Sequence, residues 1–252
     1  MTAPLESPAF KAFPQFNETG LEAIVKSTTS VDPCSALRHF PSDRPADRIG
    51  RALGARRATS IKELIESAEF YQNTRKHIHA RHIVDLCCGH GLTGMLFAVL
   101  DRQVETVTLV DRARHNCVDV ILECLCEVAP WTRDKVRFLQ LADDEWHRIE
   151  TWPSDSAVLG VHACGLLTDR CLDFALDRGL PVAVMPCCYP YQRCPAPASV
   201  RQALGGELAF DVDRTYRLES RGHAVRWRYV PKAITPMNRI LIGNPTARRD
   251  LS

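Results

Sequence analysis

Histidine and cysteine side chains gather in two short segments of this sequence that could carry out chemistry. Residues 162–165 read HACG, and residues 186–189 read PCCY. An imidazole can act as a general base near neutral pH, and a thiolate can serve as a nucleophile or as a metal ligand. Each segment directly follows an apolar run, residues 157–161 and 182–185, that is typical of a buried strand. If the two strands are neighbours, both segments meet at one edge of a sheet.

Three roles are open for these side chains. A metal site is one, but Cys187 and Cys188 are adjacent, whereas tetrahedral sites more often separate paired cysteines by two to four residues. A catalytic thiol is another. We favour a third role, in which small side chains shape a substrate pocket and His162 is the hydrogen-bond partner or general base. The predicted substrate site, for which we expect no bound metal, consists of His162, Cys164, Cys187, Cys188 and Tyr189.

A glycine-bearing turn between a strand and a helix is the next feature. Residues 82–94 read HIVDLCCGHGLTG, an apolar run followed by a turn and a helix start. Gly89 and Gly91 can adopt positive φ and let a ligand approach the backbone. In α/β folds such a turn brings a helix N-terminus to a nucleotide-like ligand. With Gly94 these glycines also fit the dinucleotide pattern GxGxxG, which is a weak signal alone.

Acidic residues favour S-adenosylmethionine over a nicotinamide dinucleotide as this ligand. Asp85 precedes the glycine pair by four residues, as in the acidic loop of Rossmann-like methyltransferases. Asp111 ends the next predicted strand, about 20 residues beyond the glycines, where a carboxylate can accept hydrogen bonds from ribose hydroxyls. Lys76 lies at the end of the helix that precedes the first strand, and we expect it near the cofactor carboxylate.

Repeated strand–helix units position these residues. A capping box at residues 60–63 begins a helix that ends near His79. The predicted strands that follow are 82–86, 106–110, 136–139, 157–161 and 182–185, with helices over 91–100, 114–128, 143–149 and 167–176 between them. Such units form a parallel sheet that binds ligands at the carboxyl ends of its strands. After a helix at 199–204, strand-like runs at 207–213, 223–230 and 239–242 predict a closing antiparallel hairpin.

Composition bounds the class of protein. The chain has 252 residues, of which 45% are hydrophobic and 25% charged, as in ordinary globular proteins. Its 11 cysteines are odd in number, so we expect free thiols, a reducing compartment and a cytoplasmic protein. No apolar run reaches the roughly 20 residues of a membrane span, and residues 1–12 lack a signal-peptide pattern. A modest basic excess follows residue 200, which permits an RNA partner without requiring one.

Prolines and arginines punctuate the first part of the chain. We expect residues 1–58 to form a cap or lid segment, and residues 59–252 to form the main domain. The five arginines between residues 44 and 57 could contact phosphates or form a solvated helix face.

Three motifs in order resemble a group of methyltransferases. They are DLCCGHG at 85–91, VHACGLLTD at 161–169 and MPCCY at 185–189. The group includes the eukaryotic tRNA acceptor-stem 2′-O-methyltransferases, the glutathione-S-transferase C-terminal-domain-containing proteins and the methyltransferase-25-like proteins. The resemblance covers roughly residues 60–243. It departs from the tRNA enzymes at Tyr189, where they have histidine, and in having no zinc-finger spacing.

The resemblance implies a class I Rossmann-like α/β fold, with a mostly parallel seven-stranded sheet, a C-terminal antiparallel hairpin and an N-terminal helical cap. It implies S-adenosylmethionine as cofactor, with Ala142 and Asp143 beside the adenine. The full expected cofactor-binding set is Lys76, Asp85, Cys87, Gly89, Gly91, Asp111, Arg112, Ala142, Asp143 and His162. We expect methyl transfer to an oxygen or nitrogen atom, with RNA weakly favoured over a small molecule. The alternative is a non-catalytic module that binds S-adenosylmethionine or a metal at the histidine and cysteine rim.

Overall fold

Five parallel strands and a C-terminal strand pair form one seven-stranded sheet with the order β3-β2-β1-β4-β5-β7-β6. The computed structural model describes residues 7–18, 22–149 and 152–246. The strands are β1 His82–Leu86, β2 Thr106–Asp111, β3 Val136–Gln140, β4 Ser156–Val161, β5 Val182–Met185, β6 His223–Tyr229 and β7 Arg239–Pro245. Strand β7 runs antiparallel to both β5 and β6. The predicted mostly parallel sheet with its closing hairpin is thereby confirmed.

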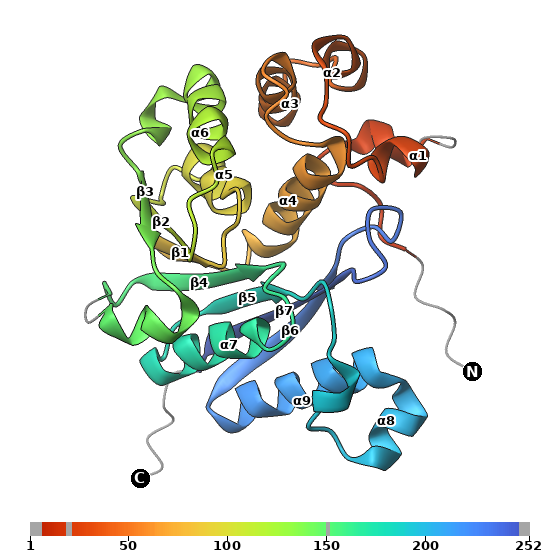
Figure 1. Cartoon of the computed structure of the whole chain (residues 1–252), viewed down its shortest axis with the longest axis vertical. Coiled ribbons are helices and arrows are strands. Elements are labelled where there is room, and N and C mark those ends of the chain that lie inside the picture. The colour runs from red at the N-terminus through yellow and green to blue at the C-terminus, as the bar shows by residue number, and fades with distance from the viewer. Residues whose placement is uncertain (1–6, 19–21, 150–151, 247–252) are drawn as a thin grey trace.

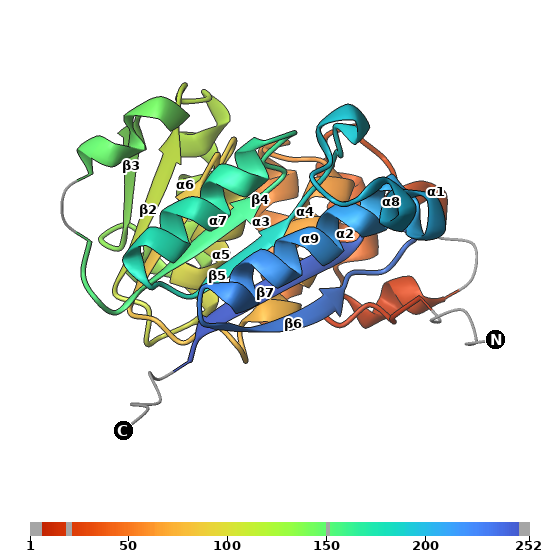
Figure 2. The ribbon, with the colours of Figure 1, turned by 90° about the horizontal axis from the view of Figure 1, so that it is seen from below.

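Helices cover both faces of this sheet (Figures 1 and 2). The helices are α1 Glu22–Val25, α2 Pro33–His39, α3 Pro45–Ala55, α4 Ile61–Thr74, α5 Leu92–Leu100, α6 Cys117–Val128, α7 Leu167–Arg178, α8 Ala198–Leu204 and α9 Gly206–Ser220. Helices α4, α5 and α6 lie on one face, and α7 and α9 lie on the other. Because both faces are covered, β4 is buried along its whole length and its sequence is almost continuously apolar.

The strand register aligns the carboxyl ends of the parallel strands. Leu86 pairs with Val110, Val110 with Leu139, and Val161 with Met185. The loops that follow β1, β2, β3, β4 and β5 therefore emerge along one edge of the sheet. Strands β4 and β5 are direct neighbours, as the two histidine and cysteine segments require.

The N-terminal segment packs against the main body through a group of aromatic rings. Phe13 and Phe40 are fully buried with ring centroids 5.1 Å apart, in the same apolar core as helix α4. The buried Glu69 carboxylate of α4 accepts the backbone N–H groups of Lys11 and Ala12, each at 2.7 Å. Residues 7–18 and 22–55 are therefore held by both apolar packing and buried hydrogen bonds.

Three of the five N-terminal arginines bind neighbouring protein groups. Arg56 pairs with Glu123 and with Glu127 on α6. Arg51 donates hydrogen bonds to two backbone carbonyls, and Arg44 bonds Asp47. These contacts link α3 to its surroundings, so a structural role accounts for much of the arginine cluster.

One predicted strand was wrong. Residues 207–213 form the first half of helix α9. The buried residues of this helix include Ala209, Phe210, Arg214 and Leu218, which recur at three- and four-residue steps along one face. The helix that begins at the capping box was predicted to end near His79 and ends at Thr74. None of the helices in the described part of the chain has the length and apolar character to cross a membrane.

Candidate functional site

A cavity of about 570 Å³ lies at the carboxyl ends of β1 to β4. Its walls come from the start of α4, the turn after β1, and the loops after β2, β3 and β4. Lys62 is the first residue along the chain that lines it, so no lining residue comes from the described part of residues 1–58. The cavity occupies the position at which open parallel sheets bind their ligands.

The glycine turn after β1 contains three left-handed residues, of which Cys87 and Gly89 line the cavity and Gly91, a predicted cofactor contact, does not. Cys87, Gly89 and Gly91 have φ values of 57°, 54° and 75°. A β-carbon on Gly91 would lie 2.6 Å from the side chain of Leu109, so only glycine fits there. Cys87 adopts a conformation that costs a non-glycine residue about 1–2 kcal/mol, and it lines the cavity together with Gly89.

Asp85 supports the turn through a hydrogen bond to the start of α5 and does not line the cavity. Its side chain is 1% exposed, and its Oδ2 accepts the backbone N–H of Gly94 at 3.0 Å. A β-carbon on Gly94 would lie 2.9 Å from that oxygen, which explains the third glycine of the pattern. Burial raises the pKa of Asp85 to about 7. We predicted Asp85 as a cofactor contact, and the structure places it as a support for the start of α5.

Asp111 faces the cavity from the end of β2. Its Oδ2 accepts the N–H of Gly89 at 2.9 Å, and its Oδ1 accepts the N–H of Ala113 at 3.3 Å. These bonds fix the carboxylate while leaving lone pairs for a ligand. Arg112 lines the cavity beside it. The structure brings both predicted residues to the cavity wall.

An apolar wall follows β3. Leu141 and the buried Trp146 line the cavity, and the Trp146 indole N–H has no hydrogen-bond partner within the described chain. Asp143 also lines the cavity and pairs with Arg170. Ala142 does not line it, because its N–H bonds Glu145 and caps the short helix Asp143–Arg148. The sequence reasoning missed Trp146, although its place after the third strand was a usable signal.

A histidine and a buried glutamate meet at the β4 end of the cavity. His162 has a φ of 59°, and its Nε2 lies 3.1 Å from the Oε2 of Glu66 on α4. Glu66 is 1% exposed, and its Oε1 has no partner among the residues described. Burial raises the pKa of Glu66, but hydrogen bonds and charge from His162 and Lys62 outweigh this effect and leave the pKa lowered. Glu66 is therefore an ionised carboxylate that fixes the imidazole.

The sequence reasoning missed Glu66 because it considered only the apolar face of α4. A usable signal existed, since Lys62 and Glu66 form an i, i+4 pair at the start of the helix before the first strand. Lys76, which we predicted near the cofactor carboxylate, is exposed beyond the other end of α4 and does not line the cavity. The adjacent His77 accepts hydrogen bonds from Arg228 of β6. A helix rises about 1.5 Å per residue, so that end lies more than about 10 Å from Glu66.

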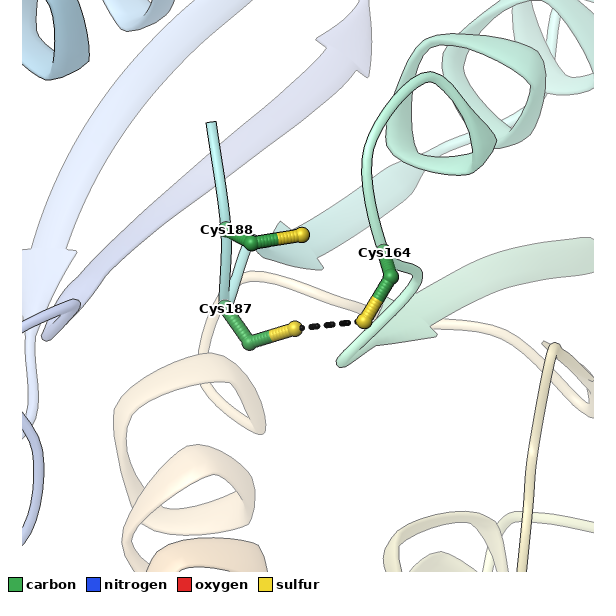
Figure 3. A group of neighbouring side chains, drawn as sticks. All are labelled: Cys164, Cys187 and Cys188. Carbon is green, nitrogen blue, oxygen red and sulfur yellow. Dashed lines mark hydrogen bonds between the residues drawn. The ribbon is translucent and has the colours of Figure 1, made fainter. Parts of the chain in front are cut away.

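Three thiols, those of Cys164, Cys187 and Cys188, converge at the ends of β4 and β5, as Figure 3 shows. The Sγ of Cys164 lies 3.0 Å from the Sγ of Cys187. The backbone N–H of Gly165 donates to the Sγ of Cys188 at 3.0 Å. Burial and the neighbouring thiols raise the pKa of Cys187, which disfavours a free thiolate nucleophile. Of the three, only Cys164 lines the cavity.

Tyr189 points away from these thiols into a buried polar network. Its hydroxyl donates to Asp211 at 2.7 Å and accepts from Arg239 at 3.3 Å. Asp211 also accepts from the buried Arg214 at 3.2 Å. Burial raises the pKa of Tyr189. We predicted a catalytic role for Tyr189, and the structure gives it the role of anchoring the loop after β5.

A second cavity, of about 510 Å³, lies beyond this loop. It is lined by basic and aromatic side chains, among them Lys11, Trp227, Arg228, Tyr229, Lys232 and Arg239. Through Arg239 and Tyr189, this basic cavity adjoins the loop that carries Cys187 and Cys188. The thiol cluster therefore borders the first cavity through Cys164 and is linked to the second through Tyr189 and Arg239.

The chain matches one protein family and is similar to several solved structures. Residues 56–192 match the protein family described as "Methyltransferase domain". No curated protein matches the chain. Among solved structures, the methyltransferase domain of a bacterial Hen1 protein, CtHen1, matches at 15% identity over 68% of this chain and 93% of its own, with a TM-score of 0.44.

Two further solved structures match with similar scores. Fibrillarin, a pre-rRNA processing protein of Methanococcus jannaschii, matches at 11% identity over 68% of each chain, with a TM-score of 0.46. The pyocyanin biosynthetic protein PhzM matches at 14% identity over 83% of this chain and 64% of its own, also at 0.46. Such low scores give no indication of the substrate of this chain.

Proposed function

We propose that this chain, which belongs to the methyltransferase-domain family and is a class I S-adenosylmethionine-dependent methyltransferase, transfers methyl groups to an oxygen or nitrogen atom of RNA. The observation that carries the proposal is the contact between His162 and Glu66 at the β4 end of the first cavity. It provides a positioned proton acceptor, which methyl transfer needs when the acceptor atom starts protonated.

The residues of the first cavity fit the cofactor. Its volume is in the range of small-molecule sites. Asp111 would accept hydrogen bonds from the ribose hydroxyls, and Leu141 with Trp146 would hold the adenine. The orphaned Glu66 Oε1 suits a cationic group of the cofactor. When bound, the cofactor supplies a methyl group on a positively charged sulfur.

The proposed contacts imply a direction for the cofactor. If Asp111 of β2 held the ribose and the residues after β3 held the adenine, the remaining part would face the end of β4. His162 and Cys164 line that end. Since His162 Nε2 faces the Glu66 carboxylate, the Nε2–H tautomer of His162 would donate there and keep a lone pair on Nδ1. That nitrogen would take the proton of an acceptor hydroxyl or amine, while the walls align the acceptor and exclude water.

The basic cavity supports RNA as the acceptor. Lys11, Arg228 and Lys232 can neutralise phosphates, and Trp227 and Tyr229 offer ring surfaces on which bases stack. Arg239 links this cavity to the loop after β5, so a strand bound there could present one nucleotide to the β4 end of the first cavity.

Transfer of labelled methyl groups tests the proposal. Purified protein is titrated calorimetrically with S-adenosylmethionine, then incubated with the labelled cofactor and total RNA. We expect binding and incorporation of label that ribonuclease removes. The Trp227→Ala variant should lose incorporation and keep cofactor binding, and a Tyr216→Ala variant, at an exposed aromatic residue on α9, should keep both.

Other outcomes separate the alternatives. Label that appears only when a small-molecule extract replaces RNA would assign a small-molecule acceptor. Cofactor binding with no transfer to either pool would favour a non-catalytic binding module. Absence of cofactor binding would overturn the assignment of the first cavity.

A further inference from the structure

Three cysteine sulfurs converge in one small volume at the edge of the first cavity. The Sγ atoms of Cys164, Cys187 and Cys188 all lie within 4.8 Å of one another. Figure 3 shows Cys164 entering from the loop before α7, and the other two from the segment after β5. From these positions we propose that Cys164, Cys187 and Cys188 bind one zinc ion and leave its fourth coordination position open toward the first cavity.

The topology explains why spacing in the sequence did not predict this site. Zinc sites more often separate the paired cysteines of one loop by two to four residues, and a search for that spacing passes over an adjacent pair. Here the adjacent Cys187 and Cys188 are met from the side by Cys164, which follows the neighbouring strand. The left-handed residues His162 and Gly165, with φ of 59° and 63°, turn that segment so that its thiol faces the pair.

The separations of the sulfurs suit a metal ion. Zinc binds thiolates at about 2.3 Å, which places the sulfurs of a tetrahedral site about 3.8 Å apart. Cys164 and Cys187, now 3.0 Å apart, would need to separate slightly, a change that side-chain rotation can provide. A disulfide would instead need about 2.05 Å and an oxidant, and it would leave Cys188 without a role.

A backbone group already supports the sulfur of Cys188. The N–H of Gly165 donates to this Sγ at 3.0 Å. Hydrogen bonds from neighbouring groups orient and stabilise metal ligands. Soft thiolate sets select zinc, monovalent copper or iron–sulfur clusters, and three ligands with an open position are typical of zinc sites that act on a substrate. Binding would displace up to three thiol protons to solvent.

The open position gives the ion a role in the reaction. Cys164 lines the first cavity beside His162, whereas Cys187 and Cys188 do not, so the fourth position points toward the methyl-transfer end. A donor atom of the acceptor that binds zinc loses its proton more easily and becomes a better nucleophile. This role rests on the proposed function, but the presence of the metal site does not.

Metal analysis of the full chain tests the proposal. Protein purified with reductant and without chelator is loaded with zinc chloride, desalted and measured by mass spectrometry of elements. We expect about one zinc ion per chain. Replacing zinc by cobalt should give intense sulfur-to-metal absorption and the visible bands of tetrahedral coordination. This second measurement needs no variant and so does not depend on how a mutant folds.

Matched cysteine variants locate the ion. Cys164→Ser, Cys187→Ser and Cys188→Ser should each bind zinc at least about a hundredfold more weakly, because a ligand is lost. Cys34→Ser removes an exposed thiol on α2 and should bind zinc as wild type does. Circular dichroism checks the fold of each variant.

Several results would overturn the site. One is a zinc content below about a tenth of an ion per chain in the loaded wild-type protein. Another is a zinc content in Cys187→Ser equal to that of wild type. A third is a disulfide between Cys164 and Cys187 in protein purified with reductant. Calorimetry with S-adenosylmethionine, run on the same samples, keeps the two proposals apart. If the protein binds zinc but not S-adenosylmethionine, the metal site is supported and the proposed function is overturned. If it binds S-adenosylmethionine but not zinc, the metal site is overturned and the proposed function is unaffected.

Discussion

The imidazole of His162, at an exposed strand end, is held at 3.1 Å by the carboxylate of Glu66, which is buried on the helix before the first strand. The two residues are far apart in sequence and belong to different elements. The pairing fixes the orientation of the His162 imidazole, as a carboxylate does for the histidine base of many active sites.

Removal of this pairing should lower turnover. We expect His162→Ala to reduce kcat about a hundredfold or more, as loss of a general base does. Glu66→Gln should reduce kcat less, and the double variant should be no slower than His162→Ala, because both changes act on one unit. Glu69→Gln, the same substitution at another buried carboxylate of α4, should leave kcat within a few-fold of wild type. Additive losses in the double variant would disconnect Glu66 from His162.

The Asp111 carboxylate should decide cofactor affinity. Asp111→Ala removes the acceptor of the Gly89 N–H and the expected partner of the ribose, so two charge-assisted interactions are lost. We expect the Kd for S-adenosylmethionine to rise at least about tenfold in calorimetry. Asp119→Ala, at an exposed carboxylate on α6, serves as the control and should bind normally. Wild-type affinity in Asp111→Ala would remove Asp111 from the cofactor site.

Asp85 should make stability depend on pH. Burial raises its pKa from 3.8 to about 7, with a further increase from Asp111, against the opposing effects of the Gly94 N–H and of His162. Between about pH 4 and 7 the folded state therefore holds more protons than the unfolded state, and the free energy of unfolding falls as pH rises. This contribution is fully present at the acid end and lost above about pH 7, with a slope of at most about 1.4 kcal/mol per pH unit.

The Asp85→Asn variant isolates this effect. Its amide oxygen still accepts the Gly94 N–H, and it has no proton to lose. In urea unfolding at a series of pH values, the stability of wild type relative to the variant should decline between pH 5 and 7 and then level off, at roughly the slope given above. Parallel stability curves for the two proteins would mean that Asp85 titrates in its ordinary range.

Tyr189 should matter for stability. Tyr189→Phe deletes the hydroxyl that joins Asp211 and Arg239, leaving buried polar groups without this partner. We expect the free energy of unfolding to fall by about 1–3 kcal/mol, while cofactor affinity in calorimetry is unchanged. Tyr191→Phe, the same change at a ring that is 57% exposed, should leave stability at the wild-type value. Equal stability of both variants, with kcat lost only in Tyr189→Phe, would restore the catalytic role that the sequence predicted.

Local patterns in the sequence predicted the features that depend on neighbouring residues. Alternating strand and helix runs led to the sheet, and the spacing of Asp85, Gly89 and Gly91 led to the turn. The position of Asp111 at a strand end brought it to the cavity, as expected. Each of these follows from the periodicity of one element or from the common edge of parallel strands.

The features that the sequence did not predict depend on contacts between distant elements. Glu66 faces His162 only because the start of α4 reaches the end of β4. Residues 207–213, which mix apolar and acidic side chains, were predicted as a strand, but tertiary burial of Phe210 and Arg214 along one face favours a helix. Tyr189 was assigned to the site because it follows two cysteines, yet the charges of Asp211 and Arg239 draw its hydroxyl inward.

The shared aromatic core bears on how the protein unfolds. Phe10, Phe13, Phe16 and Phe40 belong to the same continuous core as the strands that carry the glycine turn. Exposing a buried ring costs about 1.5–3 kcal/mol, so detaching all four would cost roughly 6–12 kcal/mol, comparable to the whole stability of a typical domain. We therefore expect the N-terminal segment and the sheet to unfold together, as one cooperative unit, so that the shape of the first cavity depends on residues that do not line it.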